Sequence, residues 1–241
     1  MTERAAAERA GPMRGAVFDL DDTLYLERDY VRSGFQALAR IVAGESGYGS
    51  SEIFEYLYGL FEGGARGDTL DRLLEGYPRI ASRYRAEDLV RLYREHEPAI
   101  ELCPGAGEIL DELRRLDIRC AIITDGPRKS QQRKLEALPL GPHRIDRAIL
   151  TDAWGRDYWK PHPRAFQEIA IGWGLSSGEL VYVGDNPAKD FLAPRRLGWR
   201  TIRVRSSGQE HFGEENPSAE HAADVEVEDF SGLARELRAL R

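Results

Sequence analysis

Hydrophobic residues recur with two different periods along the chain, and the period changes near residue 100. Between Asp29 and about Pro98, apolar residues return every three or four positions, which is the period of an amphipathic helix. These positions include Val31, Phe35, Leu38, Ile41, Val42, Ile53, Leu57, Leu60 and Phe61, with further pieces at Leu70–Leu74 and Leu89–Tyr93. No part of this segment has the alternation of a strand, so residues 27–98 are predicted to be a block of helices.

The rest of the chain alternates between short apolar runs, typical of buried strands, and amphipathic helices. The predicted strands are Gly15–Phe18, Ile118–Thr124, Arg147–Thr151, Leu180–Val183, Thr201–Val204 and Ala223–Val227. The predicted helices are Ala106–Leu116, Arg128–Leu138, Pro163–Trp173, Asp190–Leu197 and one at the C-terminus. Strands separated by helices of this length indicate a parallel sheet. The expected fold class is therefore α/β, a Rossmann-like parallel sheet with an inserted α-helical cap.

The change of pattern also divides the chain into domains. We expect a disordered tail over residues 1–13, an α/β core of residues 14–26 and 99–241, and the helical cap of residues 27–98. The polar stretch Ser206–His221 is expected to be a surface loop. The first residues, MTERAAAERAGPMRG, have no apolar run and do not resemble a secretory signal.

Composition narrows the classes of partner. The net charge of −7 argues against nucleic acid as the main partner. No apolar run approaches the ~20 residues of a membrane span. Cys103 and Cys120 are the only cysteines in the sequence, which suits a reducing cytosol, and both are expected to be small buried residues. We therefore expect a cytoplasmic protein, a monomer or homodimer, that binds neither nucleic acid nor membrane.

Four of the predicted strands are followed by polar residues that can carry chemistry. These residues are Asp19 and Asp21, then Thr124 and Asp125, then Lys160, and finally Asp185 and Asp190. Ligands of open α/β sheets bind beyond the carboxyl ends of the strands, so all of them are expected in one cleft. Carboxylates of this kind suit Mg²⁺, a Lys and a Thr can bind a phosphoryl group, and an Asp can be a nucleophile. The alternative for the first group alone is an Asx-rich turn after a strand.

In this order and spacing, the four groups resemble the motifs of the haloacid dehalogenase-like hydrolases. Asp19-Leu20-Asp21-Asp22-Thr23 matches D-x-D-x-[TV], and Thr124 ends the second motif. Lys160-Pro161 matches the third motif, and the stretch from Gly184-Asp185 to Asp190 matches G-D-x(3–4)-D. The resemblance extends from about residue 14 to 235. The position of the helical block is similar to that of the helical-cap subgroup.

The resemblance implies a phosphatase that hydrolyses a small phosphorylated metabolite, a phosphate monoester, with Mg²⁺ as cofactor. By the resemblance, Asp19 is the nucleophile and Asp21 the general acid and base. The metal is then held by the side chains of Asp19 and Asp185 and by the backbone carbonyl of Asp21. The remaining implied roles are phosphoryl binding by Thr124, Lys160 and the Asp125 amide, and orientation of Lys160 or metal waters by Asp190. Asp190 is alternatively the N-terminal anion of the helix that follows.

Single residues argue for or against other functions on the same scaffold. The presence of Asp21 argues against a dehalogenase, and the lack of Lys between Asp29 and Pro98 argues against a phosphonatase. A sugar phosphomutase shares the first motif and stays an alternative. A catalytically silent binding or regulatory module is a further alternative, but such a protein is expected to lack a motif residue, and none is missing. The substrate stays open.

Residues next to the motifs have expected roles of their own. Asp22 is expected to stabilise a turn, and His162 to lie exposed in a loop. Tyr158 and Trp159 line the substrate pocket or pack on the surface. Some arginines of the predicted cap could meet an anionic substrate, and most are expected to be solvated. They are Arg28, Arg32, Arg66, Arg72 and Arg79.

Overall fold

The computed structural model describes residues 11–241. These form two compact units, one made of the described residues up to Glu27 together with Glu101–Arg241, and the other of Arg28–Ile100. Of the expected tail, residues 1–10 lie outside the described residues. Met13 is only 4% exposed, and its N–H donates to the carbonyl of Leu240 at 2.7 Å. The expected tail therefore does not reach Met13, which is part of the packed first unit.

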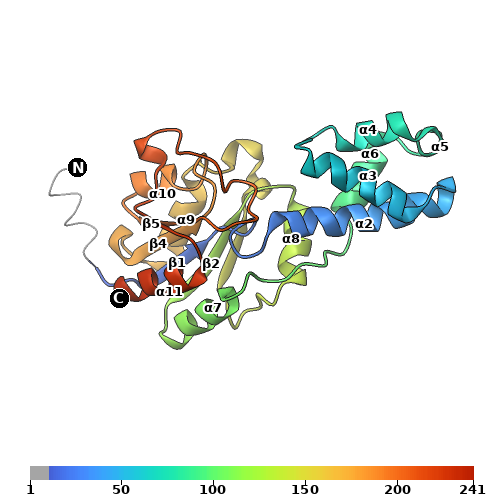
Figure 1. Ribbon diagram of the computed structural model, residues 1–241. Helices are drawn as coiled ribbons and strands as arrows, with labels where there is room; N and C mark the ends of the chain where they lie inside the picture. Colours follow the sequence, from blue (N-terminus) through green and yellow to red (C-terminus); the bar gives the residue numbers. More distant parts are fainter. Residues whose placement is uncertain (1–10) are drawn as a thin grey trace. The chain divides into compact units, whose positions relative to one another are not determined.

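The first unit is built on one parallel sheet, as predicted (Figure 1). Its strands are β1 (Gly15–Phe18), β2 (Arg119–Thr124), β3 (Arg147–Leu150), β4 (Leu180–Gly184), β5 (Arg200–Val204) and β6 (Val225–Val227). They lie in the order β3-β2-β1-β4-β5-β6, and every pair is parallel. The chain leaves β1 toward β2 on one side and later returns to β4 on the other. This makes the end of β1 the topological switch point, where open α/β sheets bind their ligands.

Helices cover both faces of this sheet. They are α7 (Ala106–Arg115), α8 (Arg128–Ala137), α9 (Arg164–Trp173), α10 (Leu192–Arg196) and α11 (Phe230–Ala239). Short 3₁₀ turns lie at Thr151–Trp154, Arg156–Tyr158, Ser177–Glu179 and Ala219–His221. Figure 1 shows α9 and α10 on one face and α7 and α11 on the other, and α8 contacts β3. The α/β fold predicted from the alternating pattern is confirmed.

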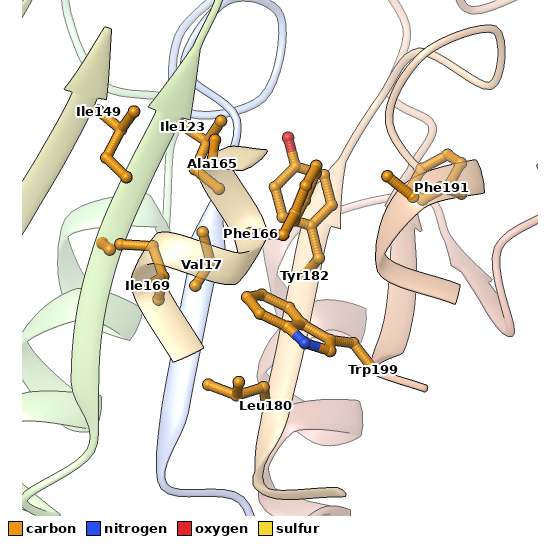
Figure 2. Packing of buried hydrophobic residues seen from close by; sticks show 12 residues of the cluster. Val17, Ile123, Ile149, Ala165, Phe166, Ile169, Leu180, Tyr182, Phe191 and Trp199 are labelled. Atoms are coloured by element: carbon orange, nitrogen blue, oxygen red, sulfur yellow. The ribbon is translucent and has the colours of Figure 1, made fainter. Parts of the chain in front are cut away.

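The face under α9 holds a continuous apolar core (Figure 2). Alternate strand residues such as Val17 and Ile123 point to this face, because side chains along a strand alternate between its two sides. Phe166 of α9 packs edge-on against Tyr182 of β4 at 5.0 Å and against Trp199 at 5.6 Å between ring centroids. Burying each such side chain contributes roughly 1.5–3 kcal/mol. In Figure 2 the Tyr182 hydroxyl points toward the carboxyl ends of the strands, so this core fixes a polar group beside the candidate site.

The second unit is helical, with a core of its own. Its helices are α2 (Glu27–Ser46), whose first residue belongs to the first unit, α3 (Ser50–Glu62), α4 (Thr69–Gly76), α5 (Pro78–Ala81) and α6 (Ala86–Arg94). Most of the apolar positions identified by period line this core, among them Leu38, Ile53 and Leu57. Ile41 does not, because it is 41% exposed and lies off the apolar face of α2.

Two findings concern the described residues as a whole. None of their helices has both the length and the apolar character that a membrane crossing requires. Both cysteines are free thiols, but only Cys120 is fully buried as expected, whereas Cys103 is half-buried. Burial raises the pKa of the Cys120 thiol to about 12, so this side chain acts as a small apolar residue.

Candidate active site

The register of the sheet brings the ends of β1, β2 and β4 to one place. Phe18 lies opposite Ile122 on one side and Val183 on the other. The next residue, Asp19, continues this pattern, because its N–H donates to the Val183 carbonyl at 2.8 Å. Asp19 therefore leaves the sheet beside the last residues of both neighbouring strands, where Thr124 ends β2.

A group of three buried carboxylates forms at this edge. Asp19, Asp185 and Asp190 each place one oxygen within 4.8 Å of the others. The Lys160 ammonium lies 2.7 Å from Asp19 Oδ1, 2.8 Å from Asp190 Oδ1 and 2.9 Å from the Tyr182 hydroxyl. Buried charges of one sign persist only when opposite charges offset their cost, and Lys160 provides part of that charge here. We call Asp19, Asp185 and Asp190 the acidic group.

The pKa values of the acidic group show that Lys160 does not balance it completely. Burial raises the pKa of Asp19 to about 6, although the charge of Lys160 opposes this. Burial and the charges of Asp190 and Asp19 raise the pKa of Asp185 well above its usual range. Burial would also raise the pKa of Asp190, but the charges of Lys160 and Lys189 lower it. A further positive charge near Asp19 and Asp185 would favour their ionised forms.

The donor atoms of the acidic group fit a hard divalent cation. Asp185 Oδ2 and Asp19 Oδ2 are buried, and neither accepts a hydrogen bond from any group within residues 11–241. Lys189 approaches Asp19 Oδ2 only to 3.9 Å, and Thr23 Oγ1 donates to Asp185 Oδ1 at 3.2 Å. Buried oxygens normally have partners, and carboxylate oxygens that lack one are ligands of the type that Mg²⁺ prefers.

Asp21 lies in a different environment, although it is only two positions from Asp19. Lys134 Nζ donates to Asp21 Oδ1 at 2.7 Å, and Gln131 Nε2 donates to Oδ2 at 2.8 Å. The Tyr25 hydroxyl also donates to Oδ1. Burial would raise the pKa of Asp21, but the charge of Lys134 and these hydrogen bonds lower it instead. Asp21 is thus an ionised carboxylate whose oxygens are both occupied by donors.

Thr124 and Asp125, at the end of β2, differ in what they bind. Thr124 Oγ1 is buried and has no hydrogen-bond partner among the described residues, so it is available to an anionic ligand. Asp125 Oδ1 accepts from Thr151 Oγ1 at 2.7 Å and from the Lys160 N–H at 3.1 Å. The side chain of Asp125 therefore fastens the loop that carries Lys160, a contact the sequence did not indicate.

Asp190 closes the site from the β4 side. Besides Lys160, it binds the N–H groups of Asp185 at 3.2 Å and Asn186 at 2.9 Å through Oδ2. A Cβ at Gly184 would lie 2.6 Å from this oxygen, so the position needs glycine for the carboxylate to approach. Because α10 begins at Leu192, Asp190 lies just before that helix, and the hydrogen bonds of its Oδ2 go to the loop between β4 and α10 instead. The contacts favour the other expectation, orientation of Lys160.

The loop expected at the surface, Ser206–His221, is partly buried against the site. Gln209 is 8% exposed and donates through Nε2 to the Asp22 carbonyl at 2.6 Å. Asp22 has a φ of 55° and accepts from the Glu27 N–H and the Glu210 N–H, both at 2.7 Å. The role of Asp22 in a turn is as predicted, and the loop lies mostly at the surface, as expected, with Gln209 as its buried residue. The burial of Gln209 could not be read from the polar composition of the loop. A polar side chain can be buried when it is hydrogen-bonded, as Gln209 is here.

Some residues of the site were missed in the sequence. They are Tyr25, Gln131, Lys134, Tyr182 and Lys189. Gln131 and Lys134 are three positions apart on the helix that follows Thr124, but Lys129 and Gln132 have the same spacing, so the sequence has no signal that selects the first pair. Lys189 lies between Asp185 and Asp190 in the fourth motif.

The aromatic loop before α9 differs from expectation at one residue. His162 is half-buried rather than exposed, with its ring centroid 4.8 Å from that of Tyr158. Its Nδ1 accepts from the Arg164 N–H at 3.2 Å. Tyr158 also lies under the Arg164 guanidinium, 4.9 Å from the ring centroid. These contacts within the loop favour packing for Tyr158 and His162.

Comparison with known proteins gives curated relatives that are named as phosphatases. The family model described as haloacid dehalogenase-like hydrolase matches residues 13–198. Glyceraldehyde 3-phosphate phosphatase of Methanocaldococcus jannaschii is 27% identical over 199 residues, which are 80% of this chain and 85% of that protein. Phosphoserine phosphatase of Thermus thermophilus is 31% identical over 120 residues, 50% of this chain and 47% of that protein.

Solved structures of the same family share the fold. A HAD family hydrolase of Deinococcus radiodurans, solved with bound phosphate and sodium, has a TM-score of 0.63 at 20% identity and covers 95% of this chain and 96% of its own. A predicted phosphoglycolate phosphatase of Haemophilus somnus has a TM-score of 0.61 at 18% identity, covering 96% of this chain and 100% of its own.

Proposed function

The chain belongs to the haloacid dehalogenase-like hydrolases, and we propose that it is a Mg²⁺-dependent phosphatase that hydrolyses a small phosphate monoester through a phosphorylated Asp19. The observation that carries this proposal is the meeting of Asp19, Lys160 and Asp185 at one sheet edge, with Thr124 at the end of the adjacent strand. Curated relatives that match most of this chain are named as phosphatases of a three-carbon phosphate, which supports the substrate class.

The first half of the reaction is assigned to Asp19. One oxygen of its buried carboxylate is proposed to attack phosphorus, and the other is then the one available to Mg²⁺. Lys160 and Lys189 neutralise part of the charge that gathers there, and Thr124 Oγ1 and the Asp125 N–H donate to phosphoryl oxygens. Asp19, Asp185 and the Asp21 carbonyl would hold Mg²⁺, which when bound supplies Lewis acidity and screens the repulsion between carboxylate and phosphate.

The second half of the reaction is assigned to Asp21. An ionised carboxylate accepts a proton from water as that water attacks the phosphorylated Asp19, and the P–O bond to Asp19 breaks. The donors that lower the pKa of Asp21 keep it in this form. In the first half Asp21 must carry a proton, which it gives to the leaving oxygen, a contribution typically worth about 10²–10⁴-fold. This step leaves the carboxylate that the second half needs as its base, and the proton taken from water then restores the acid.

A panel of phosphate esters assayed with Mg²⁺ tests the proposal. The panel includes glyceraldehyde 3-phosphate, phosphoserine and p-nitrophenyl phosphate, and released phosphate is measured. Hydrolysis is expected to need Mg²⁺, to stop with a chelator and to return when Mg²⁺ is restored.

A matched pair of variants localises the metal requirement. Asp185→Asn is expected to abolish hydrolysis, whereas Asp157→Asn, at an exposed carboxylate before Lys160, is expected to leave it unchanged. Activity that survives complete metal removal, or hydrolysis of no ester in the panel, contradicts the proposed function.

A further inference from the structure

Two side chains from helix α8 hold the Asp21 carboxylate in place. Lys134 and Gln131 are each only 3% exposed, and each donates to a different oxygen of Asp21. Because they are three positions apart, they project from one face of the helix. The Tyr25 ring lies beside them, with its centroid 5.9 Å from Lys134 Nζ. We call Lys134 and Gln131 the α8 pair.

The turn that precedes α8 is shaped to admit Gln131. Gly126 has a φ of 117°, which only glycine adopts readily. A Cβ at this position would lie 2.5 Å from Gln131 Nε2. The same Nε2 donates to the Asp125 carbonyl at 2.6 Å, so Gln131 links the end of β2 to Asp21. The backbone thus keeps space for this side chain.

Removing a lysine ammonium from water costs free energy, and at Lys134 the charge of the Asp21 carboxylate offsets this cost. The Lys134 side chain is 4% exposed and pairs with Asp21 at 2.7 Å. A buried ion pair is weak evidence for stability, since apolar residues of similar size often serve the fold as well. Its position therefore suggests a role in the reaction.

The Asp21 carboxylate lies outside the acidic group. Asp19, Asp185 and Asp190 place their oxygens within 4.8 Å of one another, and among the described residues Asp21 is not part of that group. An acid–base group must keep a defined geometry, since a displacement of about 1 Å can cost 10²-fold in rate. Asp21 is held by donors on both oxygens, which fixes the plane of its carboxylate.

We propose that Lys134 and Gln131 are positioning residues, which hold the Asp21 carboxylate away from the acidic group and in the orientation from which it exchanges protons with the leaving oxygen and with water. The proton-exchange part rests on the proposed phosphatase function, whereas the orientation of Asp21 does not. Neither side chain needs to touch the substrate.

Leaving-group dependence tests the proton-exchange part. Lys134→Met and Gln131→Leu are compared with Lys129→Met and Gln132→Leu, whose residues are exposed on the same helix. For each variant, kcat/KM is measured with an alkyl phosphate, whose leaving oxygen needs a proton, and with p-nitrophenyl phosphate, whose leaving group departs without one. The ratio of kcat/KM for the alkyl phosphate to kcat/KM for p-nitrophenyl phosphate does not depend on the folded fraction of the preparation.

The α8 variants are expected to lower this ratio by about 10-fold or more, within the range of general acid catalysis, and the controls to leave it unchanged. Lys134→Gln, which keeps a donor without the charge, is expected to fall between Lys134→Met and the wild type. In an Asp21→Asn background, Lys134→Met is expected to change the ratio no further. Equal losses on both esters, or a further loss in that background, would overturn the proposal.

Crystal structures of the wild type and of the double variant Lys134→Met/Gln131→Leu test the orientation directly. The Asp21 carboxylate is expected to leave its place when both donors of the α8 pair are removed, although the Tyr25 hydroxyl still donates to Oδ1. An unchanged Asp21 side chain would overturn the proposal, whatever the activity. If the wild type hydrolyses neither ester, the proposed phosphatase function fails, and this structural comparison still decides the positioning.

Discussion

Asp19 and Asp21 come from the same short loop, and their surroundings differ in charge. Asp19 lies among two other carboxylates, and burial raises its pKa to about 6. Asp21 is surrounded by donors, and despite its burial the charge of Lys134 lowers its pKa. The difference comes from distant parts of the chain, since Asp185 follows β4 and Lys134 belongs to α8. Two carboxylates of one loop thus become suited to different tasks through the elements packed against them.

The largest expected effect separates the two carboxylates by activity. Asp19→Asn removes the attacking oxygen, so turnover of p-nitrophenyl phosphate is expected to fall to background. Asp21→Asn keeps the nucleophile but lacks the base for the second half, so the first half is expected to survive in part with this activated ester. Phosphorylated Asp19 is then expected to accumulate, and rapid quench or a metal fluoride complex detects it.

The double variant sharpens this comparison. Because residues of one catalytic unit are not additive, Asp19→Asn/Asp21→Asn is expected to be no worse than Asp19→Asn alone. If Asp19→Asn keeps substantial activity while Asp21→Asn has none and traps nothing, the two assignments are reversed.

The polar ends of the strands could be predicted from the sequence, and their partners from α8 could not. Asp19 and Thr124 each follow an apolar run, so the parallel sheet alone brings them together. Lys134 lies in RKSQQRKLEA, where Lys129 and Arg133 have the same charge and no pattern distinguishes them. Which of these cations is buried depends on how α8 is rotated about its axis, and tertiary packing decides that.

The local sequence pattern also did not reveal which side chains depart from the usual burial of their residue type. Gln209 looks like a loop residue, yet it reaches the Asp22 carbonyl and is buried. Ile41 fits the helical period but lies just outside the apolar face. The catalytic and metal-binding roles of Asp19, Asp21, Asp185 and Lys160 stay predictions until they are tested.

An intermediate effect is expected at Lys189, which approaches Asp19 but does not contact it closely. The Lys189 side chain is 30% exposed and its ammonium lies 3.9 Å from Asp19 Oδ2. Because solvent screens this pair, Lys189→Met is expected to lower kcat/KM only about 2- to 10-fold, and less at high salt. Lys189→Arg is expected to keep most of the activity, and Lys129→Met on α8 is the control. A loss as large as that of Asp19→Asn would give Lys189 a direct catalytic role instead.

The smallest expected effect is on stability, and the two carboxylates should differ in its sign. In the folded protein the pKa of Asp19 is raised from 3.8 to about 6, so the folded state binds its proton more tightly than the unfolded state. Stability therefore falls as the pH rises from about 4 to about 6, and the deficit is complete above that range. For Asp21 the folded pKa is lowered, so its contribution is favourable above pH 3.8 and is lost as the pH falls further.

At pH 7.5 with a chelator, Asp19→Asn is expected to raise the melting temperature by roughly 2–4 °C, because it removes a carboxylate whose ionisation lowers stability. Lys160 is not left without a carboxylate, since it keeps Asp190 as a partner. Asp21→Asn is expected to lower it, because the buried Lys134 loses its ion pair with the Asp21 carboxylate. Repeating the scan near pH 4 should remove the advantage of Asp19→Asn, since the wild-type carboxyl is then protonated. Adding Mg²⁺ at pH 7.5 should stabilise the wild type more than the variant, because only the wild type keeps both carboxylates proposed to bind the ion. Shifts of the same sign for both variants would mean that Asp19 and Asp21 share one electrostatic environment, contrary to the comparison drawn from their contacts.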